Sequence, residues 1–374
     1  MTECRSGAVR DLEGILAEVD PEAVALITGG ESFRASGAAD AVEPMLALRA
    51  VERISGARPN PTAEDVLAAV ESLRACSPQL VVAVGGGSVL DLAKAARGLA
   101  TAPDVRHAVL TREVVESSGP PLVAIPTTAG TGSEATHFSA VYVDDVKYSV
   151  GHPSFRPDYV ILDPDLTASM SPRLTAETGL DALAQAMESS WSTRSTDASL
   201  EHARAALALA WTNLENAVHA PSPASRAGMC TAAHLAGQAI DISKTTAAHA
   251  LSYALTIRYG VAHGHAVALT LGALLEHNSG VSDVDCVDPR GTEFVRMRIA
   301  DVLEIIGARD GATGRQMLTR LLGSLKLETT LSSLGIGTPE ARREIVGSVD
   351  AERLANNPRA LDSNQLTAII DAIA

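Results

Sequence analysis

The stretch Ala248–Leu271, AHALSYALTIRYGVAHGHAVALTL, contains three of the ten histidines of this 374-residue chain. Gly260 and Gly264 bracket a break in a helical pattern, which predicts a helix, a turn and a second helix. A pair of helices arranged in this way can bring His249 and His263 to one divalent cation. Two half-buried histidines that cap adjacent helices would leave the same pattern, so the rest of the chain has to decide.

The composition limits the partners of the protein. The formal net charge is -15, which argues against nucleic acid, because phosphates need a basic surface. No apolar run is long enough to span a membrane, and acids stand where a signal peptide needs an apolar segment. The four cysteines form no CxxC pair, which suits a reducing compartment. We therefore expect a cytoplasmic protein that binds neither nucleic acid nor membrane.

The two halves of the chain differ in pattern. Apolar runs that predict buried strands occur at 23–28, 80–84, 122–125 and 159–162, with a hairpin at 139–150. They alternate with helical segments, which predicts a parallel sheet of the Rossmann-like α/β class. The type of element at 7–20 stays open. After Pro172 long Ala/Leu-rich helical patterns continue to the last residue. We expect an α/β domain at 1–168 and an all-helical domain at 169–374.

Two glycine-rich turns follow predicted strands. Gly85–Ser88 lies between a strand and a helix, an arrangement that presents backbone N–H groups and a helix N-terminus to phosphate. The spacing is not GxGxxG, so the dinucleotide fingerprint is not met. The segment Pro126–Glu134 collects hydroxyls and glycines after another strand. Two such loops at the carboxyl ends of strands of one sheet predict a ligand site there.

A polar stripe marks the helix that begins near Thr175, which reads TAETGLDALAQAMESSW. Asp181, Gln185 and Glu188 follow one another at spacings of four and three residues, so they share a helix face. That face either meets solvent or directs Asp181 and Gln185 at the cation of the two histidines. A carboxylate oxygen, an amide oxygen and two imidazoles suit Fe²⁺, Zn²⁺ or Mn²⁺.

Four motifs together resemble the iron-containing (group III metal-dependent) alcohol dehydrogenase family: GGGSVLDLAKA, PTTAGTGSEAT, TGLDALAQAMES and the histidines of H-x13-HGH. They follow in the family's order from about Leu26 to His277, and the closing NNPRAL at 356–361 is also similar. The resemblance implies a dinucleotide-binding domain followed by an all-helical metal domain, the dehydroquinate synthase-like fold. It also implies an enzyme that uses NAD(P) and a divalent metal.

Carried over by position, the resemblance assigns residues to both groups. The implied metal ligands are Asp181, His249 and His263, with Gln185 where a histidine is usual. The implied cofactor residues are Gly86, Gly87, Ser88, Asp91, Thr127, Thr128, Thr131 and Ser133. Gly29 and Gly30 stand where many members carry an aspartate for the ribose 2′-hydroxyl, so we expect NADPH to be favoured over NADH. Tyr253, in place of a second histidine, and His265 are the candidate proton donors, beside water.

The segments ISKTTAAHALSYALTIRYGVAHGHAVALTLG and DALAQAMESSWSTRST resemble a subgroup of this family, the phosphonoacetaldehyde reductases. This implies NAD(P)H-dependent, metal-assisted reduction of a small aldehyde, phosphonoacetaldehyde, to 2-hydroxyethylphosphonate in phosphonate biosynthesis, by a homodimer. Lys244 and Thr245 lie just before His249, where a positive charge and hydroxyls suit a phosphonate. Arg258 is a second candidate cation. An ordinary solvated lysine at a helix start is the alternative for Lys244.

Three rival functions remain open from the sequence. An alcohol or polyol dehydrogenase would keep the fold and change only the substrate pocket. A sugar-phosphate cyclase of the dehydroquinate synthase type would be a lyase with no net redox change. An inactive binding homologue would follow from a weakened metal site at Gln185. Stoichiometric consumption of NAD(P)H with an aldehyde distinguishes these classes.

Overall fold

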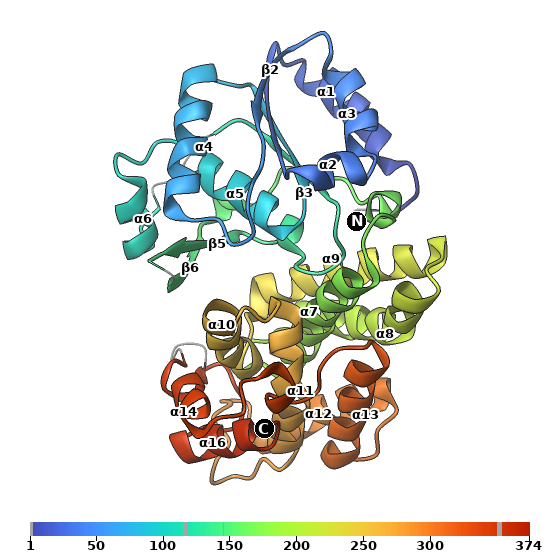
Figure 1. Ribbon diagram of the computed structural model, residues 1–374, viewed down its shortest axis with the longest axis vertical. Helices are drawn as coiled ribbons and strands as arrows, with labels where there is room; N and C mark the ends of the chain where they lie inside the picture. The colour runs from blue at the N-terminus through green and yellow to red at the C-terminus, as the bar shows by residue number, and fades with distance from the viewer. Residues whose placement is uncertain (1–2, 115–118, 145, 350–353) are drawn as a thin grey trace. The chain divides into compact units, whose positions relative to one another are not determined.

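A computed structural model of the chain describes residues 3–114, 119–144, 146–349 and 354–374, and it is shown in Figure 1. The chain divides into two compact units, Met1–Met170 and Ser171–Ala374. The first unit is α/β, and the named elements in the described part of the second unit are all helices, which confirms the expected fold class. The observed division lies two residues beyond the expected one.

A five-stranded parallel sheet forms the centre of the first unit, with strand order β2-β1-β3-β4-β7. The strands are β1 (Ala23–Thr28), β2 (Ala50–Ile54), β3 (Leu80–Gly85), β4 (Leu122–Pro126) and β7 (Tyr159–Val160). Every residue of β3 and β4 is buried, because helices cover both faces of a parallel sheet. That is why these strands appear in the sequence as unbroken apolar runs.

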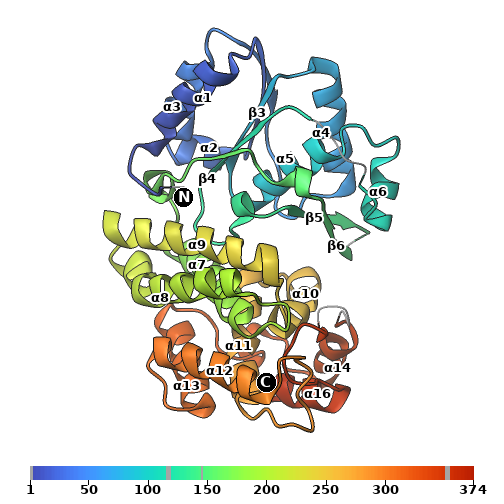
Figure 2. The same cartoon turned by 180° about the vertical axis from the view of Figure 1, so that it is seen from behind.

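Helices of the first unit pack in two layers, one on each face of the sheet (Figure 2). One layer contains α1 (Leu12–Val19), α2 (Glu31–Ala35) and α3 (Ala38–Leu46), and the other contains α4 (Ala63–Cys76), α5 (Gly87–Gly98) and α6 (Val105–Thr111). The segment 7–20, which the sequence left open, is a short 3-10 turn, Ala8–Asp11, followed by α1. The predicted hairpin is present as β5 (Phe138–Val143) and β6 (Val146–Gly151); residue 145 lies outside the described residues.

The second unit is built around α7 (Pro172–Trp191). The other described α-helices of this unit are α8 (Asp197–His219), α9 (Pro223–Ser243), α10 (Ala247–Tyr259), α11 (His263–Ser279), α12 (Thr292–Ile306), α13 (Gly311–Ser324), α14 (Pro339–Gly347) and α16 (Ser363–Asp371). All residues from Gly179 to Trp191 are buried, so the polar side chains in this part of α7 lie inside the protein. Among the described residues, no helix is long and apolar enough to cross a membrane.

Candidate metal and cofactor sites

The polar stripe of α7 is buried. Asp181 and Gln185 are each 4% exposed and Glu188 is 0% exposed, which excludes a solvent-facing stripe. Burying three polar side chains on one helix is costly unless they find hydrogen-bonding or ionic partners. The N-terminal turn of α10 supplies such partners to Asp181 and Glu188.

His249 and His263 meet Asp181 at the start of their helices. His249 Nε2 lies 3.3 Å from Asp181 Oδ1, and the two imidazole centroids are 5.4 Å apart. One ligand atom from each of the three residues lies within 4.8 Å of the other two. A carboxylate oxygen and two imidazole nitrogens that converge in this way fit a divalent cation. Gln185 occupies the next turn of α7, on the same face as Asp181.

Gly264 explains how α11 reaches this position. A Cβ atom at Gly264 would overlap the carbonyl oxygen of Glu177 and lie 3.0 Å from Asp181 Cβ. The first turn of α11 therefore packs directly on the backbone of α7, which brings His263 beside Asp181. The sequence indicated the break at Gly260, which ends α10 with a φ of 69°, but not the reason for Gly264.

Glu188 contacts His249 from the other side of the ring. Its Oε2 is hydrogen-bonded to His249 Nδ1. Burial disfavours charge on both groups, yet their close pairing lowers the pKa of Glu188 and raises the pKa of His249 to about 8. In the sequence Glu188 is one member of the stripe with no assigned role; its place two turns after Asp181 was the available signal.

The two candidate proton donors have different surroundings. The Tyr253 ring stacks on the His263 ring, with centroids 6.4 Å apart and planes 5° apart. His265 is 0% exposed, and its Nε2 donates a hydrogen bond of 2.7 Å to the carbonyl oxygen of Glu328. The proton on His265 Nε2 is thus held by the backbone, whereas Tyr253 lies against a candidate metal ligand. The geometry favours Tyr253.

The candidate anion-binding residues separate into two places. Lys244 follows α9 as its C-cap with a φ of 60°, is half-buried, and its Nζ donates to the carbonyl oxygen of Asp241 at 3.4 Å. Thr245 is 7% exposed and stands beside it. Arg258 instead forms an ion pair with Glu344, and its side chain is 50% exposed.

The two glycine-rich loops of the first unit are in contact. Thr127 N donates to Gly85 O at 3.0 Å, and a Cβ atom at Gly87 would lie 2.6 Å from Thr131 Oγ1. α5 begins at Gly87, and its N-cap, Gly86, provides no side-chain cap. No side chain caps the N-terminus of α5, which stays a candidate phosphate site.

Asp91 and Ser133 hold this loop in place. Asp91 accepts hydrogen bonds from Ser133 Oγ at 2.5 Å and from Ala140 N at 3.1 Å. The fully buried Lys94 donates to the carbonyl oxygens of Ser133 and Phe138 at 2.8 and 2.5 Å. Asp91 and Ser133 thus stabilise the loop through hydrogen bonds inside the protein. Ser88, Thr128 and Thr131 are instead partly exposed on the loop.

Gly29 and Gly30, which bear on cofactor choice, directly follow strand β1. Gly29 is buried and Gly30 is exposed. A Cβ atom at Gly29 would overlap the hydroxyl of Ser32. A side chain at Gly29 would therefore require the Ser32 side chain to move or change. With glycine at this position, no carboxylate is present there.

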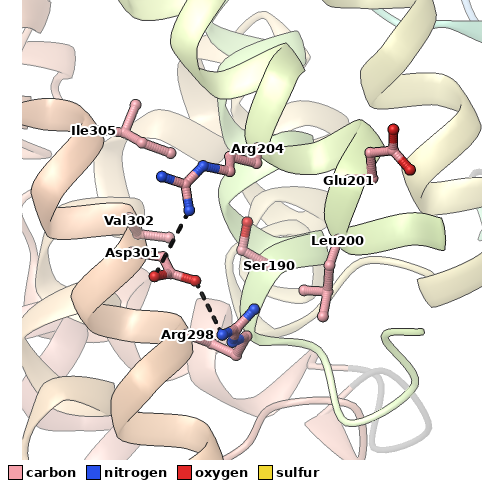
Figure 3. A pocket seen from close by; sticks show the side chains of 8 residues that line it. All are labelled: Ser190, Leu200, Glu201, Arg204, Arg298, Asp301, Val302 and Ile305. Carbon is pink, nitrogen blue, oxygen red and sulfur yellow. Dashed lines mark ion pairs between the residues drawn. The ribbon is translucent and has the colours of Figure 1, made fainter. Parts of the chain in front are cut away.

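A separate cavity of about 160 Å³ lies among α7, α8 and α12 (Figure 3). It is lined by Ser190, Leu200, Glu201, Arg204, Arg298, Asp301, Val302 and Ile305. Asp301 pairs with Arg204 at 3.8 Å and with Arg298 at 3.2 Å. Because the acids compensate the two guanidinium groups, this cavity does not have the net positive charge that an anion site requires.

Comparisons with known proteins identify the family of the chain. The model of "iron-containing alcohol dehydrogenase" matches residues 2–164, and that of "Fe-containing alcohol dehydrogenase family, C-terminal" matches residues 175–374. The phosphonoacetaldehyde reductase of Streptomyces viridochromogenes is 38% identical over 342 residues, covering 87% of this chain and 84% of that protein. The long-chain-alcohol dehydrogenase 1 of Geobacillus thermodenitrificans is 33% identical over 330 residues, covering 84% and 80%.

Solved structures show the same likeness. The sulfoacetaldehyde reductase of Bifidobacterium kashiwanohense in complex with NAD⁺ has a TM-score of 0.87 and 30% identity, covering 100% of this chain and 97% of that one. An iron-containing alcohol dehydrogenase of Thermotoga maritima has a TM-score of 0.85 and 28% identity, covering 100% and 97%. The chain belongs to the iron-containing alcohol dehydrogenase family. It is an NAD(P)-dependent oxidoreductase of the aldehyde reductase and alcohol dehydrogenase type.

Proposed function

We propose that this enzyme reduces phosphonoacetaldehyde to 2-hydroxyethylphosphonate with NADPH, in phosphonate biosynthesis. The observation that carries the proposal is the position of Lys244 and Thr245 immediately before α10, whose first turn carries His249. Two relatives support it by their names: one is a phosphonoacetaldehyde reductase and the other a sulfoacetaldehyde reductase. Both names describe two-carbon aldehydes that carry a tetrahedral anionic group.

The segment of Lys244 is anchored to α7, which carries Asp181. Ser243 Oγ and Ser189 Oγ are 2.7 Å apart, and Ser192 Oγ donates to Ser243 O at 2.7 Å. Asn356 of the NNPRAL motif donates to Thr245 O at 3.1 Å. The backbone of the proposed anion site is therefore fixed relative to the candidate metal ligands. This suits a substrate in which only two bonds separate phosphorus from the carbonyl carbon.

The residues of the two proposed sites, one in each unit, have distinct tasks. When bound, a divalent cation supplies Lewis acidity toward the carbonyl oxygen, and NADPH supplies the hydride. Asp181, Gln185, His249 and His263 would hold the cation. Lys244 and Thr245 would bind and orient the phosphonate oxygens, and the Tyr253 hydroxyl would supply the proton for the alkoxide. The backbone N–H groups at Gly86, Gly87 and Ser88 would bind the cofactor phosphates.

A spectrophotometric screen of NADPH oxidation across small aldehydes tests this function. Phosphonoacetaldehyde should be reduced with a kcat/KM at least about 100-fold above that of propanal, because an ionic contact is worth about 1.5–3 kcal/mol and an anion site offers more than one. Equal kcat/KM values would favour an ordinary alcohol dehydrogenase. Failure to consume NADPH with any aldehyde would favour a lyase or an inactive homologue.

A further inference from the structure

Glu188 is the most fully enclosed acid beside the candidate metal site, and its two oxygens face different partners. Oε1 accepts hydrogen bonds from Thr246 Oγ1 at 2.7 Å, Ala248 N at 2.9 Å, Thr246 N at 3.1 Å and His249 N at 3.4 Å. Oε2 is bonded to His249 Nδ1. The carboxylate thus connects the α7 interior with the whole first turn of α10.

The contacts of Oε1 satisfy N–H groups at the N-terminus of α10. The first N–H groups of a helix have no partner within the helix, and the N-cap of α10, Thr246, makes no side-chain cap. Its hydroxyl donates to Glu188 and accepts from Trp191 Nε1 at 3.1 Å. A carboxylate from another helix therefore caps α10, and its negative charge is favoured at that end of the helix dipole.

The contact of Oε2 sets the protonation of His249. An ionised carboxylate only accepts hydrogen bonds, so the hydrogen in this contact belongs to His249 Nδ1. A neutral imidazole carries one N–H. Its Nε2, which lies 3.3 Å from Asp181 Oδ1 and would otherwise donate to that carboxylate, then has a lone pair for a cation that the two residues share. In the opposite tautomer Nε2 would carry a hydrogen and could not ligate a metal.

We propose that Glu188 is a positioning residue with two separable tasks: one oxygen caps α10, and the other fixes His249 as the Nδ1–H tautomer that ligates the cation through Nε2. The inference rests on the proposed metal site. The capping of α10 by Glu188 does not depend on a metal, because its hydrogen bonds are all within the protein.

The Glu188→Gln variant separates the two tasks. The several donors of α10 require an acceptor, so the amide oxygen stays on α10 and the amide NH₂ faces His249 Nδ1. That nitrogen must then accept, which moves the hydrogen to Nε2. We expect the metal-free variant to melt close to the wild type, while its affinity for Zn²⁺ falls about 10- to 100-fold, the range typical of partners that orient a metal ligand. Glu188→Ala should lose both stability and affinity.

Zn²⁺ affinity should be measured in chelator-buffered solution near pH 9, so that proton competition for the histidines is reduced in both proteins. Asp163→Asn is the matched control. Asp163 is 1% exposed and accepts main-chain hydrogen bonds from Val9 at 3.0 Å and Asp165 at 3.1 Å, so it is a buried acid whose oxygens bind backbone N–H groups. This variant should bind Zn²⁺ like the wild type.

Nitrogen-15 NMR of histidine-labelled, metal-free wild type at the same pH reads the tautomer directly and needs no variant. A His249 signal of the Nδ1–H form supports the proposal, and a signal of the Nε2–H form overturns it. Wild-type Zn²⁺ affinity in Glu188→Gln also overturns it, as does an equal fall in the melting temperatures of the metal-free Gln and Ala variants. If the wild type binds no divalent metal, the metal site fails, while the NMR result still decides the tautomer.

Discussion

At the residue scale, the candidate metal site depends on a few side chains with little redundancy. Asp181, His249 and His263 come from three helices, and Gln185 offers an amide where the family usually has a histidine. Because an amide oxygen is a weaker ligand than imidazole, the two histidines carry most of the expected affinity.

Replacing His263 by alanine should therefore abolish tight metal binding. We expect Zn²⁺ or Fe²⁺ affinity to fall more than about 100-fold, beyond the effect of losing an outer partner, with aldehyde reduction lost in parallel. Equilibrium titration and metal analysis of the purified protein measure this. His107→Ala, at an exposed position on α6, is the control. Full turnover of a thoroughly chelated sample would contradict the metal assignment.

The proposed anion site makes a prediction about substrate discrimination. Lys244→Ala should raise KM for phosphonoacetaldehyde about 10- to 100-fold, the value of a charge-assisted contact, and leave the reduction of propanal nearly unchanged. Lys326→Ala is a close control, because Lys326 is exposed and has the same φ of 60°, so both substitutions replace a lysine at a positive φ. Equal losses on both aldehydes would show that Lys244 does not bind the phosphonate.

Cofactor choice can be tested at Gly29. NADPH should be used at least as well as NADH, and the double variant Gly29→Asp/Ser32→Gly should shift the ratio of kcat/KM toward NADH by about 10-fold or more. The Ser32 change removes the hydroxyl that a Gly29 side chain would overlap. Ser32→Gly alone serves as the reference. A wild-type preference for NADH of about 100-fold would reverse the assignment.

At the element scale, the site depends on how closely helices approach. α11 packs on α7 through a glycine, and α10 is capped by a side chain from α7. These contacts place the N-terminal turns of two helices against the interior of a third. The metal ligands are therefore an outcome of helix packing, and a change in packing should affect them even without touching a ligand.

Gly264→Ala tests this dependence. The added methyl group meets the Glu177 carbonyl oxygen, which belongs to the α7 backbone and has little freedom to move. We expect the free energy of unfolding to fall by about 1–3 kcal/mol in urea titrations, and Zn²⁺ affinity to fall with it. Gly14→Ala, where a Cβ atom meets nothing within 4 Å, should instead be neutral or stabilising. Unchanged Zn²⁺ affinity in Gly264→Ala would show that the metal site does not depend on the close contact between α11 and α7.

At the scale of the whole molecule, residues far apart in the chain hold the helical unit together. Arg359 Nε donates to Asp285 Oδ2 at 2.7 Å. The paired amides of Asn278 and Asn357 form hydrogen bonds of 3.1 and 2.9 Å. The NNPRAL motif is thus connected to α11 through Asn357 and to the loop before α10 through the bond from Asn356 to Thr245.

This connection should make stability depend on pH in the acid range. Burial opposes ionisation of Asp285, but hydrogen bonds from Ser282 and Arg359 together outweigh it and lower the pKa of Asp285 to about 2. A group with a lowered folded-state pKa stabilises the fold above its unfolded pKa, near 3.8, and this stability is lost as the pH falls through about 2. Asp285→Asn should cost about 1–2 kcal/mol at pH 7, allowing for solvent screening. The difference from wild type should shrink in unfolding titrations between pH 4 and pH 2; a constant difference would contradict the pairing.

The sequence by itself determined the fold class and most of the elements. Buried parallel strands read as unbroken apolar runs because both faces of the sheet are covered, and the glycine at 260 marks the turn between α10 and α11. β2 was missed because it is an edge strand whose residues are largely exposed, so it leaves no apolar run. The segment 7–20 stayed open because two of the residues in α1 are buried, too few to fix a period.

The tertiary structure alone decided what the polar residues do. A polar stripe on a helix has the same spacing whether it meets solvent or the protein interior, and only the packing of α8, α9 and α11 around α7 buries Asp181, Gln185 and Glu188. The pairing of Glu188 with His249 joins positions 61 residues apart. No local pattern encodes such a contact, because it depends on where two helix termini come to lie against a third helix.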